Sequence, residues 1–381
     1  MTKKLVVVLM VLAVLGSLVA GCGKEKTIKI GLNTELTGSI PVVGQSCKNA
    51  AEMAVQEVND AGGLEVGGTK YKIDLIVEDN EDKAESAAAV AQKLITQDNV
   101  VAMIGPNASR NAIPAADIAE SSKVPMISPW STNVKTCEGK KYVFRACFTD
   151  AFQGVVCAKF ALNSLHATKA AVLYDVASEY NKGIAEVFKK TFEEQGGKIV
   201  AFESYTTGDK DFSSQLTRIK AANPDVLFLP NYYSEVPLQV QQAHKLGYKG
   251  AFLGSDSWGS TELIKLGGAD MEGQFFSTHY APDIATPQAQ KFISAYKAKY
   301  GSVPDDVAAL TYDSFGLLFQ ALQACGKIDD REALRNALAQ IQSYQGVTGN
   351  IKYEGTGDPV KSAVILQIKN GQFTYYETAN P

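Results

Sequence analysis

The stretch VAMIGPNASRNAIPAADIAESSKVPMIS, residues 101–128, predicts two buried strands joined by a crossover helix. The short apolar runs Val100–Gly105 and Val124–Ser128 are typical of strands that are covered on both faces. The segment Ser109–Ser122 between them has the pattern of an amphipathic helix. A strand, a helix and a strand in this order place the two strands parallel in one sheet.

The same unit recurs along most of the chain, in two series. The first series also contains strands Thr27–Asn33 and Lys70–Glu78 and helices near Gln45–Ala61 and Lys83–Gln97. The second has strands within residues 170–175, 196–205, 224–230 and 250–256, and helices near Asn181–Gln195, Asp211–Ala222 and Glu235–Leu246. In both series a helix ends at paired glycines, Gly62-Gly63 and Gly196-Gly197, which favour a left-handed cap. Two similar doubly wound α/β lobes are therefore predicted.

After Tyr280 the order of elements changes. The sequence predicts helices Pro287–Tyr300, Asp305–Cys325 and Arg331–Ile341, then strands within residues 346–354, 362–371 and 373–378. A chain of 381 residues with 45% hydrophobic content is long enough for two domains. The returning helices and strands suggest that several segments cross between the lobes and form a hinge. The expected lobes are residues 27–147 with 281–352, and residues 148–280 with 353–381.

The N-terminus reads as a secretory signal. Lys3 and Lys4 precede an apolar run from Leu5 to Leu15 and a stretch of small residues that ends at Cys22. The apolar run is shorter than the roughly 20 residues that span a bilayer. The junction LVAGC resembles a bacterial lipobox, which implies cleavage of residues 1–21, lipidation of Cys22 and a polar tether at residues 22–26. An ordinary signal peptide with an incidental Cys22 is the alternative. The protein is expected outside the cytoplasm, as a lipoprotein anchored in the periplasm or on the outer face of the cell membrane.

Charge and cysteine content exclude several classes of partner. The formal net charge is −4 and no dense run of Lys or Arg occurs, which argues against nucleic acid. The three histidines are far apart and no C-x-x-C spacing occurs, so neither a metal nor another cofactor is expected. After Cys22 an odd number of cysteines remains, and their pairing cannot be predicted; they are Cys47, Cys137, Cys147, Cys157 and Cys325.

Enzymatic motifs are missing from the sequence. It has no Gly-x-Gly-x-x-Gly after a strand, no phosphate loop ending in Gly-Lys-Ser/Thr and no Gly-x-Ser-x-Gly elbow. The segment Gly254–Gly259 resembles an elbow but lacks the glycine two residues before Ser257. The acidic run Glu78–Asp82 has the composition of a solvated loop. The chain is therefore not expected to be an enzyme.

Polar and aromatic residues follow the predicted strands at their carboxyl ends. These loops are GPNASRN at residues 105–111, SPWSTN at 128–133, YDVASEYNKG at 174–183, LPNYYSE at 229–235 and GSDSWGS at 254–260. In open parallel sheets, ligands bind outside the carboxyl ends of strands and at helix N-termini. A ligand site is therefore predicted between these five loops.

The combination of motifs resembles the type I periplasmic binding proteins, and within them the leucine/isoleucine/valine-binding branch. The resemblance rests on the lipobox, TIKIGLNTELTG at residues 27–38, AVQEVNDAGG at 54–63 and the loop segments quoted above, and covers essentially the whole mature chain. It implies two Rossmann-like lobes joined by three crossings that close around a ligand. It also implies a monomer that delivers a free, neutral α-amino acid, apolar or branched-chain, to the membrane subunits of an ABC importer.

The resemblance also implies the ligand-binding residues. Ser109 and Thr132 match positions that hold the ligand carboxylate, Trp130 matches the position whose backbone carbonyl accepts from the ammonium, and Ser131 lies in the same loop. From the second lobe, Tyr180 and Tyr232 match family tyrosines, and Asp256 matches the acid that pairs with the ammonium.

Several positions depart from the family pattern. Val43 replaces a tyrosine, Asp256 replaces the usual glutamate, and Glu81 and Ala108 stand where a disulfide is usual. Trp130 replaces a small residue, either as a wall of the ligand cleft or as a plug in the core. The side-chain preference of the family therefore does not carry over. Two alternatives stay open: a receptor for an amide, a urea-like compound or an aromatic carboxylate, and the ligand-binding part of a signalling system.

Overall fold

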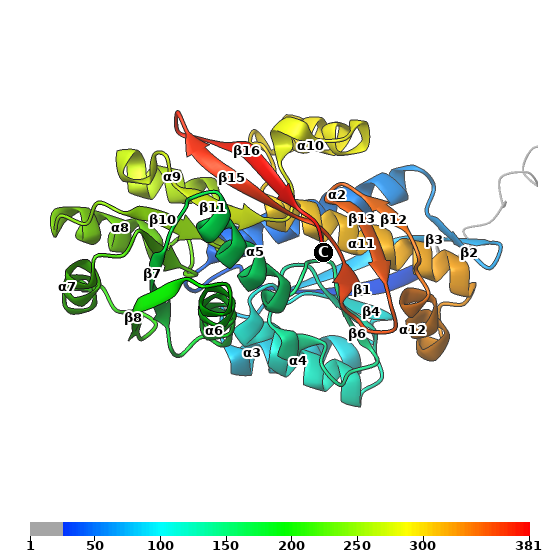
Figure 1. Ribbon diagram of the computed structural model, residues 1–381. Helices are drawn as coiled ribbons and strands as arrows, with labels where there is room; N and C mark the ends of the chain where they lie inside the picture. Colours follow the sequence, from blue (N-terminus) through cyan, green and yellow to red (C-terminus); the bar gives the residue numbers. More distant parts are fainter. Residues whose placement is uncertain (1–25) are drawn as a thin grey trace, which may run out of the picture.

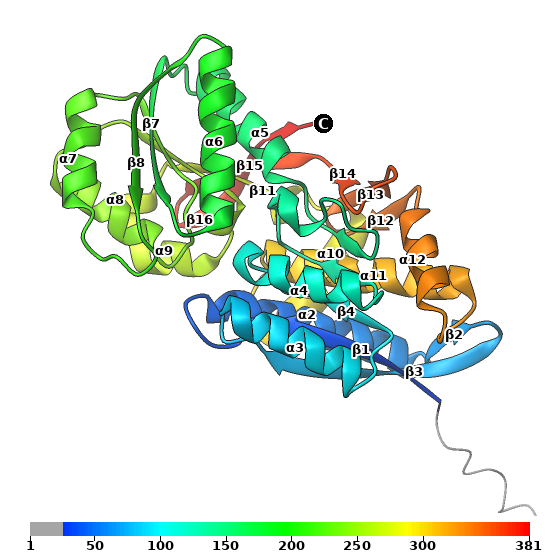
Figure 2. The same ribbon diagram turned by 90° about the horizontal axis from the view of Figure 1, so that it is seen from below.

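Two β-sheets, each covered by helices, organise the computed structural model, which describes residues 26–381. Figures 1 and 2 show them as two lobes that lie side by side. The signal peptide, the lipidated Cys22 and nearly all of the tether fall outside the described residues. Within residues 26–381, no helix combines the length and the apolar character that a membrane crossing requires.

The first lobe is built on a six-stranded sheet with the strand order β2-β3-β1-β4-β5-β6. Its strands are β1 (Thr27–Thr34), β2 (Leu64–Val66), β3 (Thr69–Asp79), β4 (Ala102–Ile104), β5 (Met126–Ser128) and β6 (Val143–Arg145). All neighbours are parallel except β2, which forms a hairpin with β3. The carboxyl ends of its parallel strands therefore lie at one edge of the sheet, as the sequence predicts.

Helices from two parts of the chain cover this sheet. They are α2 (Pro41–Asp60), α3 (Ala84–Thr96), α4 (Ser109–Ser121), α10 (Pro287–Tyr300), α11 (Asp306–Cys325) and α12 (Arg331–Ala339), with a short 3-10 turn η1 (Val134–Thr136). The long helix α11 packs along α2, so the late helices belong beside the first sheet. A small sheet of β12 (Tyr344–Gly346), β13 (Gly349–Tyr353) and β14 (Pro359–Val360) follows.

The second lobe has a seven-stranded sheet with the order β16-β15-β11-β10-β9-β7-β8. Its parallel strands are β7 (Lys169–Asp175), β8 (Lys198–Tyr205), β9 (Val226–Leu229), β10 (Ala251–Gly254) and β11 (Phe275–Thr278), and an antiparallel hairpin of β15 (Ala363–Lys369) and β16 (Gln372–Ala379) closes one edge. Its helices are α5 (Asp150–Asn163), α6 (Glu179–Glu194), α7 (Ser213–Ala222), α8 (Val236–Lys245) and α9 (Thr261–Gly267), with the 3-10 turns η2 (Asp256–Trp258), η3 (Gly268–Met271) and η4 (Pro282–Ile284).

The predicted fold class, two doubly wound α/β lobes, is confirmed by these two sheets. The chain passes from one sheet to the other three times: between β6 and β7, after β11, and before β15. The elements that the sequence did not predict are α5, α9, β2, β6, β11, β12 and β14. Helix α5 buries residues on several sides because it packs against both α6 and β11, so it lacks the single apolar stripe of a surface helix.

The five cysteines after Cys22, whose pairing the sequence left open, are free thiols in this structure. Cys325 is half-buried, whereas the other four are buried. Cys147 lies next to the predicted site, where its thiol donates to the backbone carbonyl of Ser131 at 3.2 Å.

The close approach of α5 to α6 leads to a stability prediction. A methyl group on Gly154 of α5 would lie 2.7 Å from Cβ of Val187, although Gly to Ala usually stabilises a helix. Gly154→Ala is expected to lower the free energy of unfolding by about 1–3 kcal/mol because the two helices must move apart. Urea denaturation measures this change. The double variant Gly154→Ala/Val187→Gly removes the clash, because glycine lacks both Cβ and Cγ1, and should be less destabilised than the sum of the two single variants; additive effects would contradict the explanation.

Candidate ligand site

Loops from both lobes meet around a small cavity of about 10 Å³, which is about the space of one water molecule. The cavity lies at the carboxyl ends of the two parallel sheets. It is lined by Asn107, Ala108, Ser109, Trp130, Tyr180, Tyr232 and Asp256. The structure thus brings together Ser109, Trp130, Tyr180, Tyr232 and Asp256 of the residues expected from the sequence.

Ser109 offers a hydroxyl proton at the N-terminus of α4. Its oxygen accepts hydrogen bonds from the Ser131 hydroxyl at 2.9 Å and from the Asn133 amide at 3.3 Å, so its own proton remains to be donated. The first amides of α4 have no partner within the helix, and the helix dipole favours a negative charge there. This end of the cavity is therefore suited to a carboxylate.

The buried carboxylate of Glu35 fixes the loop that leads into α4. It accepts from the backbone amides of Asn107 at 3.2 Å and Ala108 at 3.1 Å, and from both Asn107 and Asn111 side chains. Burial raises the pKa of Glu35, and the two asparagine side chains act in the opposite direction. Glu35 was not expected from the sequence, because it lies after β1 and reaches α4 only in the folded chain.

Ser131 and Thr132 lie beside the cavity and do not line it in this structure. The Ser131 hydroxyl is also within 2.7 Å of the Thr136 hydroxyl, so Ser131 supports Ser109 from behind. The Thr132 hydroxyl is buried and has no hydrogen-bond partner among the described residues. A hydroxyl of this kind is able to donate to a ligand.

Arg145, at the end of β6, holds the loop that follows β5. Its guanidinium donates to the backbone carbonyls of Ser131 at 2.7 Å and Asn133 at 2.9 Å. It also forms an ion pair with Asp358 at 2.7 Å, although Arg145 itself is fully buried. The sequence analysis missed this residue, since it stands inside a short strand and not in a polar loop. It fixes the backbone on which Trp130 and Thr132 stand.

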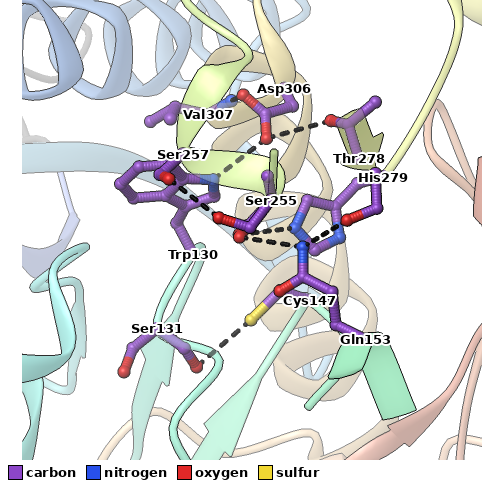
Figure 3. A network of polar contacts seen from close by, with 12 residues as sticks. Trp130, Ser131, Cys147, Gln153, Ser255, Ser257, Thr278, His279, Asp306 and Val307 are labelled. Carbon is purple, nitrogen blue, oxygen red and sulfur yellow. Dashed lines mark hydrogen bonds and ion pairs between the residues drawn. The ribbon is translucent and has the colours of Figure 1, made fainter. Parts of the chain in front are cut away.

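Trp130 is both a wall of the cavity and part of the core. Its side chain lines the cavity while the residue is only 5% exposed. The indole nitrogen donates to the Asp306 carboxylate at 3.0 Å, and Asp306 also accepts from the Thr278 hydroxyl at 3.2 Å (Figure 3). The ring centroids of Trp130 and Tyr232 are 6.1 Å apart. The two interpretations of Trp130 are therefore compatible.

Asp256 follows β10 and forms the opposite pole of the cavity. One carboxylate oxygen accepts from the Tyr180 hydroxyl at 2.6 Å and from the Gln153 amide at 3.0 Å, and the other lies 3.3 Å from His279 Nε2. Burial lowers the pKa of His279 to about 4, so the imidazole is neutral at pH 7. No Lys or Arg in residues 26–381 forms an ion pair with Asp256, which is 1% exposed. Neutral donors surround the carboxylate.

Asp150, at the start of α5, adds a second acid that the sequence analysis missed. Both of its carboxylate oxygens are buried without a hydrogen-bond partner among the described residues. Burial raises the pKa of Asp150 well above its usual value; the nearby Thr132 hydroxyl acts in the opposite direction and the charge of Asp256 in the same direction. The only signal in the sequence was Thr149, which caps α5 by accepting from the Phe152 amide at 3.3 Å.

The side chains of Asp256, His279 and Asp306 lie close enough to suggest a metal site, since one ligand atom of each falls within 4.8 Å of the others. However, both carboxylates already accept from neutral donors, including Trp130 and Thr278 at Asp306. Burial raises the pKa of Asp306 well above its usual value. We therefore interpret the three side chains as parts of two neighbouring hydrogen-bonded groups, Asp256 with His279 and Asp306 with Trp130 and Thr278, the second of which is shown in Figure 3.

Three contacts join the lobes at the mouth of the cavity. The Asn133 side chain donates to the backbone carbonyl of Glu179 at 2.8 Å, and Lys135 pairs with the Glu179 carboxylate at 2.6 Å. The guanidinium of Arg110 lies over the ring of Tyr232, 4.8 Å from its centroid. In each contact, one partner follows a strand of the first sheet and the other follows a strand of the second. The lobes are therefore closed on each other.

Known proteins resemble this chain over most of its length. Residues 27–372 match the family model described as periplasmic binding protein. The leucine-, isoleucine-, valine-, threonine- and alanine-binding protein of Pseudomonas aeruginosa is 31% identical over 92% of this chain and 90% of its own length. The leucine-binding protein LivK of Thermotoga maritima is 35% identical, with a TM-score of 0.88 over 93% of this chain and 99% of that chain. The branched-chain amino acid transporter substrate-binding protein LivJ of Streptococcus pneumoniae, solved with isoleucine, is 33% identical, with a TM-score of 0.87 over 93% and 100%.

The neutral, buried imidazole of His279 predicts a pH dependence of stability. Its pKa falls from 6.5 to about 4 on folding, so below pH 6.5 the unfolded chain takes up a proton that the folded chain does not. Stability from this group is complete above pH 6.5 and is lost as the pH falls towards 4, by at most about 1.4 kcal/mol per pH unit. In urea denaturation at several pH values, His279→Gln should lose less stability over this range than the unmodified protein.

The buried acids with raised pKa change stability with pH in the opposite direction. Both His279→Gln and the unmodified protein contain these acids, so their contributions cancel when the two proteins are compared. His166→Gln removes an exposed histidine outside the cleft and serves as the matched control. An unchanged pH slope in His279→Gln would contradict a neutral imidazole at this position.

Proposed function

We propose that this chain, which belongs to the periplasmic binding protein family, is the extracytoplasmic solute-binding receptor of an ABC importer and binds a free, neutral α-amino acid between its lobes. The family consists of solute receptors for transporters and not of enzymes. The partners in this proposal are the amino acid and the membrane subunits of the importer.

One observation carries the choice of ligand. A buried carboxylate without a cationic partner, Asp256, stands across a cavity from Ser109 and the N-terminus of α4. An α-amino acid has an ammonium and a carboxylate on one carbon atom, so it complements both poles at once. Asp256 accepts from the ammonium, and Ser109, the first amides of α4 and the unpartnered Thr132 hydroxyl donate to the carboxylate.

The names of the relatives support the same ligand class. The Pseudomonas protein is named for leucine, isoleucine, valine, threonine and alanine, and the Streptococcus protein was solved with isoleucine. All of these are neutral α-amino acids. In a receptor of this kind the shared ammonium and carboxylate fix the ligand, and the walls between the two poles select its side chain.

Closure of the lobes is the signal that the importer reads in this proposal. We assign residues 27–147 and 281–352 to one moving body, and residues 148–280 and 353–381 to the other, in a monomer. Because Ser109 and Asp256 belong to different bodies, the ligand binds the closed state more tightly than the open state. The contacts of Glu179 with Asn133 and Lys135 form only in the closed state and add to that preference.

We also propose that the protein is anchored to the membrane by a lipid on Cys22. In a bacterial host, the full chain is expected to partition into the detergent phase of a Triton X-114 extraction, and Cys22→Ala is expected to stay in the aqueous phase. Cys325→Ala, which removes a half-buried thiol elsewhere, should behave like the unmodified protein. An unmodified chain found in the aqueous phase would contradict the anchor.

The charge of Asp256 is testable by ligand binding. Neutral α-amino acids should raise the melting temperature of the protein, whereas their deaminated analogues should not. In calorimetry, Asp256→Asn should weaken the binding of the same amino acid ~30-fold or more, because an ammonium left unpaired in a buried site costs about 2–5 kcal/mol. Asp329→Asn removes the same charge at an exposed position and should leave the affinity unchanged.

Stabilisation by an amide, a urea-like compound or an aromatic carboxylate, with none by amino acids, would replace the amino acid by that ligand class on the same fold. Equal affinity of Asp256→Asn and the unmodified protein would show that this acid does not pair with the ammonium.

A further inference from the structure

We propose, on the basis of the function above, that the site selects α-amino acids with small side chains, of the size of glycine, alanine or serine, and that Trp130, fixed by Asp306, excludes larger ones. The indole occupies the space beside the two poles of the cavity, into which the side chain of a longer amino acid would extend. Asp306 is thereby a specificity-determining residue that acts through Trp130.

The size of the cavity is the first argument. Between Ser109 and Asp256, the lobes leave about 10 Å³, which is about the space of one water molecule, so any amino acid must displace the walls to some extent. The crowding is local, because a groove of about 570 Å³ lies between β11, β15 and the start of α11 in the same molecule. The four carbon atoms of a leucine side chain require a larger displacement of these walls than the single side-chain carbon atom of alanine.

Trp130 cannot swing away without losing a buried hydrogen bond. Its indole nitrogen donates to Asp306 Oδ2 at 3.0 Å, and Asp306 is held in turn by the Thr278 hydroxyl at 3.2 Å and the Val307 amide at 3.0 Å. Figure 3 shows the indole and the carboxylate joined in this way. An indole N–H that is turned into the core without a partner is costly, since buried donors are almost always paired. The geometry around Asp306 therefore fixes the ring.

The residues packed around Trp130 also prevent the ring and its neighbours from moving away from the cavity together. Tyr232 lies on one side with its ring centroid at 6.1 Å, and the centroids of Tyr232 and Tyr180 are 5.5 Å apart. On the side of Asp306, a methyl group on Gly259 would lie only 2.6 Å from a carboxylate oxygen, so the wall behind the indole is closely packed. Arg145 holds the backbone that follows Trp130, through the carbonyls of Ser131 and Asn133. A larger ligand would have to displace this packing.

Calorimetry with glycine, L-alanine and L-leucine tests the proposal on four proteins. The unmodified protein should bind alanine at least tenfold more tightly than leucine. Trp130→Ala should reverse this order, because the ring that fills the space is removed. Asp306→Ala should reduce the preference for alanine at least threefold, since the indole is then free to turn. Trp258→Phe is the matched control, because Trp258 is fully buried, donates to the Leu229 carbonyl at 3.1 Å and does not line the cavity; its order should be unchanged.

Two results would overturn the proposal: tighter binding of leucine than of alanine by the unmodified protein, or an unchanged order in Trp130→Ala. If Trp130→Ala does not fold, Trp130→Leu takes its place, and the order measured on the unmodified protein is decisive in either case. The failure of this inference differs from the failure of the proposed function. A protein that binds leucine best is still an amino acid receptor, whereas a protein that binds none of the neutral amino acids is not.

Discussion

The buried carboxylate of Asp256, which no cation balances, is the constraint on which the site depends. Transfer of an ion into a protein interior costs several kcal/mol unless it is paired. Tyr180, Gln153 and His279 offset part of this cost through hydrogen bonds, but all three are neutral. The closed lobes therefore bury a negative charge that is balanced only when a ligand supplies a cationic group. The unpaired charge favours the open state of the empty protein, whereas a bound cationic group favours the closed state.

The sequence was sufficient for the fold and for one half of the site. Strand ends in parallel sheets converge, so the five loops were predicted to meet, and the resemblance to the family selected Ser109, Trp130, Tyr180, Tyr232 and Asp256 within them. The residues that hold these side chains were missed for a common reason. Arg145 and Thr278 lie in short strands, and Asp150 and Asp306 open helices far from the loops in the sequence. Their roles depend on contacts between distant segments, which no local pattern records.

Trp130 shows why a residue can fit two opposed interpretations. A core residue is recognised by its burial, and a residue in the wall of a cavity is recognised by its contact with the cavity. The indole meets both criteria because its two edges face different surroundings. Its polar edge reaches Asp306, and its other side lies along the cavity. Tryptophan suits such a position, because it combines a large apolar surface with one hydrogen-bond donor. A phenylalanine would fill much of the same space but would leave Asp306 without that donor.

The hydrogen bonds around Asp306 also determine at which step of binding the ligand side chain is selected. Trp130 follows β5 of the first sheet, Asp306 begins α11, which packs beside that sheet, and Thr278 ends β11 of the second sheet. The hydrogen bonds at Asp306 thus join both lobes, and the cavity has its full set of walls only when they are closed. An open protein can bind the carboxylate or the ammonium of a large amino acid on one lobe, but it cannot close over the side chain. Because closure is what the importer detects in our proposal, discrimination against large ligands belongs to closure and not to the first encounter.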